Sequence, residues 1–458
     1  MTTVRPGRAS TAADTAVRQT ATSSLARVLL GSLLTGLVGA LALPLLVFPG
    51  APEHLITGSI LLAFAAGWAL LAVLSIRLTT RPQRWALVPA TVLAATGLLL
   101  VTFAPGNGVL TGAGWVWPPA LFVLVLWMIV QLRRAMTGRA RWLLYPVIGA
   151  LALASVGGLA ETVALHRDAA GMPMPGISYE VRGHRLHLQC AGAGAGSPTV
   201  VLESGLDGMS AHWARVAPAV AATTRVCRYD RAGQGWSGDA SGPQDGLAVA
   251  ADLHALLAAA GEPRPYVLVG HSTGGVYAMA YAAQHPEQVA GMVLLDSATP
   301  EQFTALPRYP SSYAMMRRAL GIAPTMARLG LGRFVSERAM SGLPSPAAGQ
   351  VRAFVLSPRG LRAMREELSA LPAAFDQAGA LRTLAGKPLA VLTATDSPQP
   401  GWAAAQDRLA ALSSNSSHRL IDTTHAGLLD DPRAASAAAL AITDVVRAAR
   451  AGGPLPTR

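Results

Sequence analysis

Apolar residues are concentrated in the first 165 positions, where five long stretches contain almost no charge. These stretches lie near residues 26–48, 55–76, 85–104, 115–132 and 142–163. Each approaches or exceeds the ~20 residues that cross a ~30 Å hydrocarbon core at 1.5 Å per residue. Because five of them follow one another with only short polar loops between them, the pattern predicts an all-α transmembrane bundle of five helices at 26–165.

Positive charge alternates between the loops of this predicted bundle. The leader 1–25 and the loops after the second and fourth helices carry arginine, whereas the loops near 49–54 and 105–114 contain no Lys or Arg. The positive-inside rule therefore predicts a cytoplasmic leader, and an odd number of helices places the rest of the chain on the outer side of the cell membrane. Because much of the net charge of +12 lies in these loops, it does not indicate a nucleic-acid partner.

The remainder of the chain has the mixed polarity of a soluble domain. A Pro/Gly-containing linker is expected at 166–176, a folded domain at 177–450 and a disordered tail at 451–458. Short apolar strands alternate with amphipathic helices, which predicts a largely parallel sheet covered on both faces. The expected strands are 177–182, 184–190, 199–202, 225–229, 266–269, 289–295, 388–393 and 418–421.

One strand-to-helix junction has a distinctive composition. The strand Tyr266–Val269 runs directly into Gly270-His271-Ser272-Thr273-Gly274-Gly275, and an apolar helix follows. Glycines at such a turn let the helix pack closely on the strand and leave the serine oxygen exposed at the sheet edge. We therefore take Ser272 as a candidate nucleophile. The plainer alternative is a glycine-rich turn with an incidental serine.

A serine nucleophile needs a base, an acid that orients the base, and donors for the oxyanion. His425 is the candidate base, because it follows the last expected strand at the same edge of the sheet; the alternative is an ordinary loop histidine. Asp396 follows the next-to-last strand and is the preferred acid, since it gives the order Ser, Asp, His. Asp296, one strand earlier, is the alternative acid.

A helical block separates two of the expected strands. Residues 297–386 are rich in Met, Arg, Leu and Pro, and contain no convincing strand. Such a block is expected to form a lid over the catalytic edge of the sheet.

The region 176–450 resembles the serine α/β-hydrolases of the esterase, lipase and proline-iminopeptidase-like group. The resemblance rests on Gly270–Gly275, on Tyr229-Asp230-Arg231-Ala232-Gly233-Gln234-Gly235-Trp236-Ser237 and on His425–Pro432. It implies an eight-stranded, mostly parallel sheet with an antiparallel second strand, a lid after the sixth strand, and no metal or cofactor. Asp230 and Arg231 are expected to be a structural pair that shapes their loop.

The chain departs from the family where an oxyanion donor is expected. The family often has His-Gly after the third strand, but this chain has Glu203-Ser204-Gly205-Leu206. The backbone amides of Leu206 and Thr273 can still supply two donors. A structural role is expected for Glu203.

Two cysteines, Cys190 and Cys227, both belong to the outer domain. An oxidising compartment permits a disulfide between them, although two buried free thiols are the alternative. The strand order implied by the resemblance makes the second and fourth strands neighbours, which favours the bridge.

These features predict a membrane-anchored serine hydrolase that cleaves carboxylic esters or related acyl bonds. Its expected partners are a small-molecule or lipid-like ester and the lipid bilayer, with the oligomeric state left open. Two alternatives remain. One is an aminopeptidase or acyltransferase that uses the same triad, and the other is a transporter, sensor or binding module with a hydrolase fold. The absence of central charges in the five helices argues against an ion path.

Overall fold

The computed structural model describes residues 9–136, 139–192, 198–333, 335, 342–396 and 399–456. The predicted leader therefore lies partly outside the described residues, as does a short part of the predicted lid. The chain divides into two compact units. The first contains residues 1–164 with 328–330, and the second contains 165–327 with 331–458.

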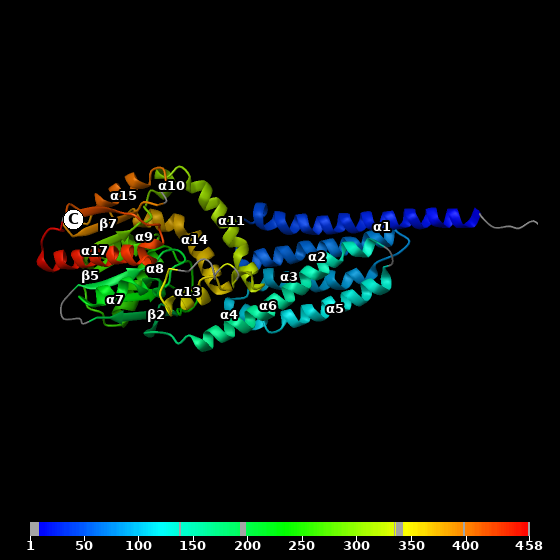
Figure 1. The fold of residues 1–458 in the computed structure, drawn as a ribbon, viewed down its shortest axis with the longest axis horizontal. Coiled ribbons are helices and arrows are strands. Elements are labelled where there is room, and N and C mark those ends of the chain that lie inside the picture. Colours follow the sequence, from blue (N-terminus) through cyan, green and yellow to red (C-terminus); the bar gives the residue numbers. More distant parts are fainter. Residues whose placement is uncertain are drawn as a thin grey trace, which may run out of the picture. The chain divides into compact units, whose positions relative to one another are not determined.

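The first unit is helical, and it contains the five predicted apolar helices (Figure 1). The candidate spans are long and apolar enough to cross a membrane. The last of them continues to Gly171, so the first half of the expected linker is helical. The helices are α1 (Ala9–Ala42), extended by Leu43–Val47, then α2 (Glu53–Leu78), α3 (Leu87–Phe103), the short α4 (Asn107–Ala113), α5 (Trp117–Ala135) and α6 (Tyr145–Gly171).

Small residues bring the helices of the first unit close together. A Cβ atom on Gly67 would lie 2.9 Å from the Ser32 carbonyl oxygen of α1. A Cβ atom on Gly58 would lie 2.9 Å from the Gly97 carbonyl oxygen of α3. Close backbone approach through small residues is the usual way in which helices associate in lipid, where no hydrophobic effect drives them together.

The second unit is built on an eight-stranded sheet of order β1-β2-β4-β3-β5-β6-β7-β8. The β2 strand is antiparallel to both of its neighbours, and all the other pairings are parallel, so the expected sheet type is confirmed. The strands are β1 (Ile177–Val181), β2 (His184–Ala191), β3 (Thr199–Glu203), β4 (Val226–Asp230), β5 (Tyr266–His271), β6 (Val289–Leu295), β7 (Leu389–Ala394) and β8 (Ser416–Ile421).

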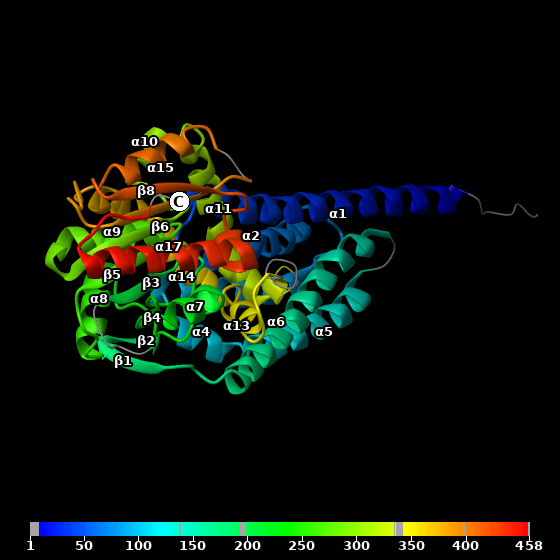
Figure 2. The same cartoon turned by 60° about the vertical axis from the view of Figure 1, so that its left-hand side comes forward.

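Helices cover both faces of this sheet (Figures 1 and 2). Side chains of a strand alternate between its faces, so Val200 and Leu202 pack with one core while Val201 packs with the other. The first core includes residues of α7 (Val216–Ala221) and α17 (Pro432–Ala451). The second includes residues of α8 (Gly246–Ala259), α9 (Gly274–Gln284) and α14 (Pro358–Ala378). The parallel strands have continuous apolar sequences because both of their faces are buried.

The segment between β6 and β7 is helical wherever the structure describes it. Its helices are α10 (Gln302–Ala305), α11 (Tyr309–Arg328), α13 (Ala347–Phe354) and α14. Within α14, Leu368, Leu371 and Phe375 are buried in the core on the α8 and α9 face of the sheet. The expected lid segment is therefore partly a structural layer of the domain.

The C-terminal tail differs from the expectation of disorder. The α17 helix ends at Ala451, but Leu455 beyond it is only 7% exposed and belongs to the core beneath α17. Its backbone amide donates to Asn415 Oδ1 at 2.8 Å. Apolar burial and a side-chain acceptor therefore both hold Leu455 of the expected tail.

Candidate active site

Ser272 occupies a strained turn between β5 and α9. Its φ of +56° lies in the left-handed region, which residues other than glycine rarely adopt. The glycines around it are sterically required. A Cβ atom on Gly274 would lie 2.3 Å from the Glu203 carbonyl oxygen, and one on Gly275 would lie 1.8 Å from Ser297 Oγ. A sharp strand-to-helix turn of this kind places the side chain at its centre at the edge of the sheet.

His425 is held by Asp296. Nδ1 of His425 lies 2.6 Å from Oδ2 of Asp296. A carboxylate only accepts hydrogen bonds, so Nδ1 carries the proton and Nε2 is left as the basic nitrogen. Asp296 directly follows β6, and its Oδ1 accepts from the Trp402 indole at 2.8 Å and from the Ala394 amide at 3.2 Å. These bonds fix the carboxylate and, through it, the imidazole.

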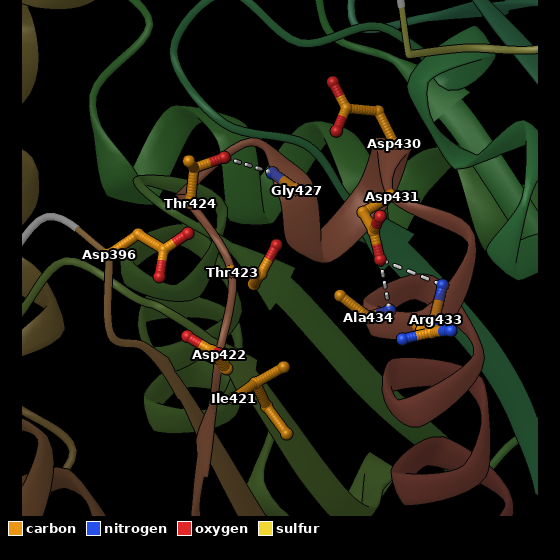
Figure 3. A pocket seen from close by; sticks show the side chains of 10 residues that line it. All are labelled: Asp396, Ile421, Asp422, Thr423, Thr424, Gly427, Asp430, Asp431, Arg433 and Ala434. Atoms are coloured by element: carbon orange, nitrogen blue, oxygen red, sulfur yellow. Dashed lines mark hydrogen bonds between the residues drawn. The ribbon is translucent and has the colours of Figure 1, made fainter.

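The preferred acid, Asp396, does not contact the histidine. Within the described residues no hydrogen bond or ion pair joins Asp396 to His425. Asp396 is exposed and lines a polar pocket beside Asp422 and Thr423 (Figure 3). Desolvation and a hydrogen bond with Asp422 raise its pKa. Strands β6 and β7 are parallel neighbours that end at one edge, so strand order alone could not separate the two candidates, and the alternative Asp296 makes the contact.

His271, the residue before Ser272, supports the loop of His425. Its Nε2 lies 3.0 Å from the His425 carbonyl oxygen, and the two ring centroids are 4.6 Å apart. Burial, and next the neighbouring His425, lower the pKa of His271 to about 3. A neutral His271 therefore donates to this carbonyl and places His425 beside the turn of Ser272. The only signal in the sequence was its position next to the serine.

The serine itself has no hydrogen bond to the histidine. Among the described side chains, the Ser272 hydroxyl has no hydrogen-bond partner. Of the two hydrogen bonds expected among the candidate residues, the structure therefore contains the one between His425 and Asp296 and lacks the one between Ser272 and His425. Catalytic hydrogen bonds in ligand-free enzymes are often long and shorten only when substrate binds.

The two expected oxyanion donors belong to segments that adjoin the serine. Gly205 packs against Ser272, since a Cβ atom on Gly205 would lie 3.0 Å from the Ser272 Cβ atom. Leu206 follows Gly205, and Thr273 follows Ser272. Within the described part of the chain, neither the Leu206 nor the Thr273 amide donates a hydrogen bond to protein. Both are therefore available to a ligand.

Asp230 and Arg231 do not form the structural pair that was expected. Asp230 Oδ2 lies 2.9 Å from His187 Nδ1, and Asp230 also accepts from the backbone amide of Ser210. Arg231 instead binds two buried carboxylates, Glu203 and Glu367. No motif in the sequence marks Glu367, because it lies within α14 and is distant in the chain from the strand ends that carry the other candidates.

The two cysteines are joined by a disulfide, as the strand order implied. Cys190 of β2 lies directly opposite Cys227 of β4. Together with Glu262 they form a candidate group of metal ligands among the described residues. The two sulfur atoms are bonded to each other, so neither is a thiolate, and the Glu262 carboxylate is paired with Arg225. This group therefore does not offer the ligands that a cation needs.

The comparisons with known proteins agree with this fold. Residues 198–345 match the family model of the alpha/beta hydrolase fold. The chain is 33% identical over 155 residues to the 2-hydroxymuconate semialdehyde hydrolase of a Pseudomonas species. The aligned region covers 32% of this chain and 55% of that protein. The chain is 32% identical over 142 residues to a protein of Hormonema carpetanum named probable transporter efuK, covering 30% of this chain and 20% of that one.

A solved structure of similar fold is the enol-lactonase from Burkholderia xenovorans. It has 21% sequence identity to this chain and a TM-score of 0.45, and the match covers 59% of this chain and all of the lactonase. The two curated relatives named above are matched over no more than 55% of their own length.

Proposed function

We propose that this chain, which belongs to the alpha/beta hydrolase family through its sheet domain, is a membrane-anchored serine hydrolase of carboxylic esters or related acyl bonds. The observation that supports this most is the bond between His425 and Asp296, at the sheet edge where Ser272 occupies its left-handed turn. A base fixed by a buried acid beside a serine hydroxyl is the arrangement that activates a serine.

In the proposed reaction the Ser272 oxygen attacks the acyl carbon while His425 Nε2 takes its proton. Asp296 stabilises the imidazolium, and the amides of Leu206 and Thr273 bind the oxyanion. Collapse of the tetrahedral intermediate breaks the bond to the alcohol, which leaves with the proton from His425. Water, deprotonated by His425, then attacks the acyl-serine, releases the acid and restores the Ser272 hydroxyl.

The proposed location is the cell membrane, with the sheet domain on the outer side. Five apolar helices long enough to cross a bilayer support the anchoring. The arginine-free loops near 49–54 and 105–114 support the orientation. The disulfide between Cys190 and Cys227 also supports an outer location, because such bonds persist in oxidising compartments. The proposed substrate is a small-molecule or lipid-like ester.

The test is activity-based labelling of the full chain on intact cells with a membrane-impermeant fluorophosphonate. We expect labelling of the wild type, loss of labelling in Ser272→Ala, and unchanged labelling in Ser436→Ala, whose exposed hydroxyl donates to the Pro432 carbonyl oxygen of its own helix. A panel of p-nitrophenyl esters and aminoacyl anilides would then define the bond that is cleaved. Undiminished labelling or hydrolysis in Ser272→Ala would contradict the proposal.

A further inference from the structure

A buried arginine lies behind the candidate oxyanion hole. Arg231 directly follows β4 and is only 4% exposed. Its Nη1 donates to Glu203 Oε1 at 2.7 Å, and its Nη2 donates to both carboxylate oxygens of Glu367 at 3.0 and 3.1 Å. Glu203 ends β3, whereas Glu367 lies in the middle of α14. One guanidinium therefore joins the sheet edge to the helical segment between β6 and β7.

The same guanidinium binds the backbone of the loop that carries an oxyanion donor. Nη1 donates to the Ser204 carbonyl oxygen at 2.6 Å, and Nη2 donates to the Gly205 carbonyl oxygen at 2.5 Å. In a trans peptide the N–H points away from the C=O of the same unit. Holding the Gly205 carbonyl toward Arg231 therefore turns the Leu206 N–H to the opposite edge of that peptide.

That opposite edge belongs to a loop packed on the nucleophile. A Cβ atom on Gly205 would lie 3.5 Å from Ser272 Oγ, so the Gly205–Leu206 peptide adjoins the serine. The Leu206 carbonyl is itself restrained by Gln234 Nε2 at 3.4 Å. Small rotations of this peptide would move the donor relative to the oxyanion, whose stabilisation requires donors about 2.7–3.1 Å away.

Arg231, Glu203 and Glu367 form a buried charged cluster, and the stability of each charge depends on the other two. Glu203 is 2% exposed and Glu367 is 4% exposed. Burial raises the pKa of Glu367 to about 7, against the opposing effect of Arg231. Tyr277 of α9 donates to Glu367 Oε1 at 3.1 Å, and its ring centroid lies 5.0 Å from the Arg231 guanidinium carbon. Removing one charge of such a cluster leaves its partners buried and uncompensated.

On the basis of the serine hydrolase function proposed above, we propose that Arg231 is a positioning residue for the oxyanion hole. It fixes the Ser204 and Gly205 carbonyls so that the Leu206 amide faces the reacting carbonyl, and Glu367 of α14 holds Arg231 in that orientation. The helical segment between β6 and β7 thereby contributes to catalysis without touching the substrate.

The test compares Arg231→Lys and Glu367→Gln with wild type in the full chain, using the best p-nitrophenyl ester. Lysine keeps the charge but cannot bind two carboxylates and two carbonyls in one plane. We expect kcat to fall about 10- to 100-fold in Arg231→Lys, with KM within about threefold of wild type, because a donor used in the transition state is misplaced. Glu367→Gln keeps the shape of the side chain, and we expect kcat to fall about 3- to 10-fold.

A trifluoromethyl ketone separates positioning from a purely structural role. Its hemiketal oxygen occupies the oxyanion hole, so we expect its inhibition constant to rise by the same factor by which kcat falls. Arg225→Lys is the matched control, since Arg225 makes a similar two-pronged pair with Glu262 at 2.6 and 2.8 Å, away from the site. We expect it to match wild type in kcat and inhibition constant.

The outcomes distinguish this inference from the function on which it rests. Folded Arg231→Lys and Glu367→Gln proteins with wild-type kcat and wild-type inhibition constants would overturn the positioning role while leaving the hydrolase intact. If Arg231→Lys does not fold, Glu367→Gln decides alone by the same two measurements. Hydrolysis that does not require Ser272 would instead overturn the proposed function itself.

Discussion

Asp296 and His425 are 129 positions apart in the chain, and their side chains meet at 2.6 Å. The carboxylate that makes this contact is held from three directions. Its second oxygen accepts from the backbone of Ala394 in β7 and from the indole of Trp402 at the start of α15 (Trp402–Ala410). Asp296 therefore cannot turn away from the histidine without leaving two donors unsatisfied, which favours it as the acid of the triad.

The first prediction separates the two candidate acids. We expect Asp296→Asn to lower kcat by about 10³- to 10⁴-fold, because an amide can donate to Nδ1 and stabilise the wrong imidazole tautomer. Asp396→Asn is the matched control and should retain wild-type activity, since Asp396 is exposed and faces Asp422 instead. Ester hydrolysis by the full chain in detergent measures both. An inactive Asp396→Asn beside an active Asp296→Asn would reverse the assignment.

The second prediction tests the packing of the turn that carries the nucleophile. Gly275→Ala places a Cβ atom 1.8 Å from Ser297 Oγ and 2.7 Å from the Ser297 Cβ atom. Rotation of the Ser297 hydroxyl cannot relieve the second contact, so the backbone of α9 or of Ser297 has to shift. We expect the free energy of unfolding to fall by about 1–3 kcal/mol. We also expect fluorophosphonate labelling to be lost.

The same substitution should have the opposite effect elsewhere. Among the described residues, nothing outside the neighbouring backbone of α13 itself lies within 4 Å of a Cβ atom added at Gly349. Because alanine is the better helix former, Gly349→Ala should stabilise the chain by up to about 1 kcal/mol. The thermal midpoints of both variants test the pair. A Gly275→Ala protein as stable and as reactive as Gly349→Ala would contradict the packing argument.

The fold could be predicted from periodic patterns of apolar residues in the sequence. The individual side-chain contacts of the candidate site could not. The strands around Ser272 are buried on both faces, so they appear as apolar runs with glycine at their ends. The choice between Asp296 and Asp396 depended on which of two neighbouring strand ends turns its carboxylate toward His425, and no pattern encodes that turn. Arg231 looked like the partner of Asp230 next to it, but its partners come from elements distant in the chain.

Burial of isolated residues was equally invisible in the sequence. Leu455 lies in the tail that was expected to be disordered, yet its side chain is buried in the core and its amide donates to Asn415 Oδ1. Such contacts depend on the shape of the finished core, and local composition carries no information about that shape.

The third prediction concerns the disulfide, which closes a loop of 37 residues. In the chain-entropy model, a disulfide that closes a loop of this length restricts the unfolded chain and so raises the free energy of unfolding by about 4 kcal/mol. We therefore expect the double substitution Cys190→Ala with Cys227→Ala to lower the thermal midpoint of the sheet domain. Alkylation under denaturing conditions supplies the control, because wild type should react only after reduction. A thiol-specific reagent that labels unreduced wild type would contradict the bridge.

The fourth prediction follows from the low pKa of His271. Burial, and next His425, lower it to about 3, whereas an unfolded histidine titrates near 6.5. The folded state therefore binds no proton at His271 where the unfolded state already does. The stability that the neutral imidazole provides is complete above pH 6.5 and is lost as the pH falls toward 3. Asp296 and Asp207 also face this group and favour its protonation, but burial outweighs them.

Between pH 7 and pH 5 this single group should cost the folded state about 2 kcal/mol. Comparison with His271→Gln isolates the effect, because all other titrating groups are shared and glutamine can still donate to the His425 carbonyl. We expect the thermal midpoint of wild type in detergent to fall about 4–8 °C further than that of His271→Gln over this range. If the thermal midpoints of the two proteins fell equally, His271 would take up its proton in the folded state as well. That result would contradict a neutral His271 that donates to the His425 carbonyl.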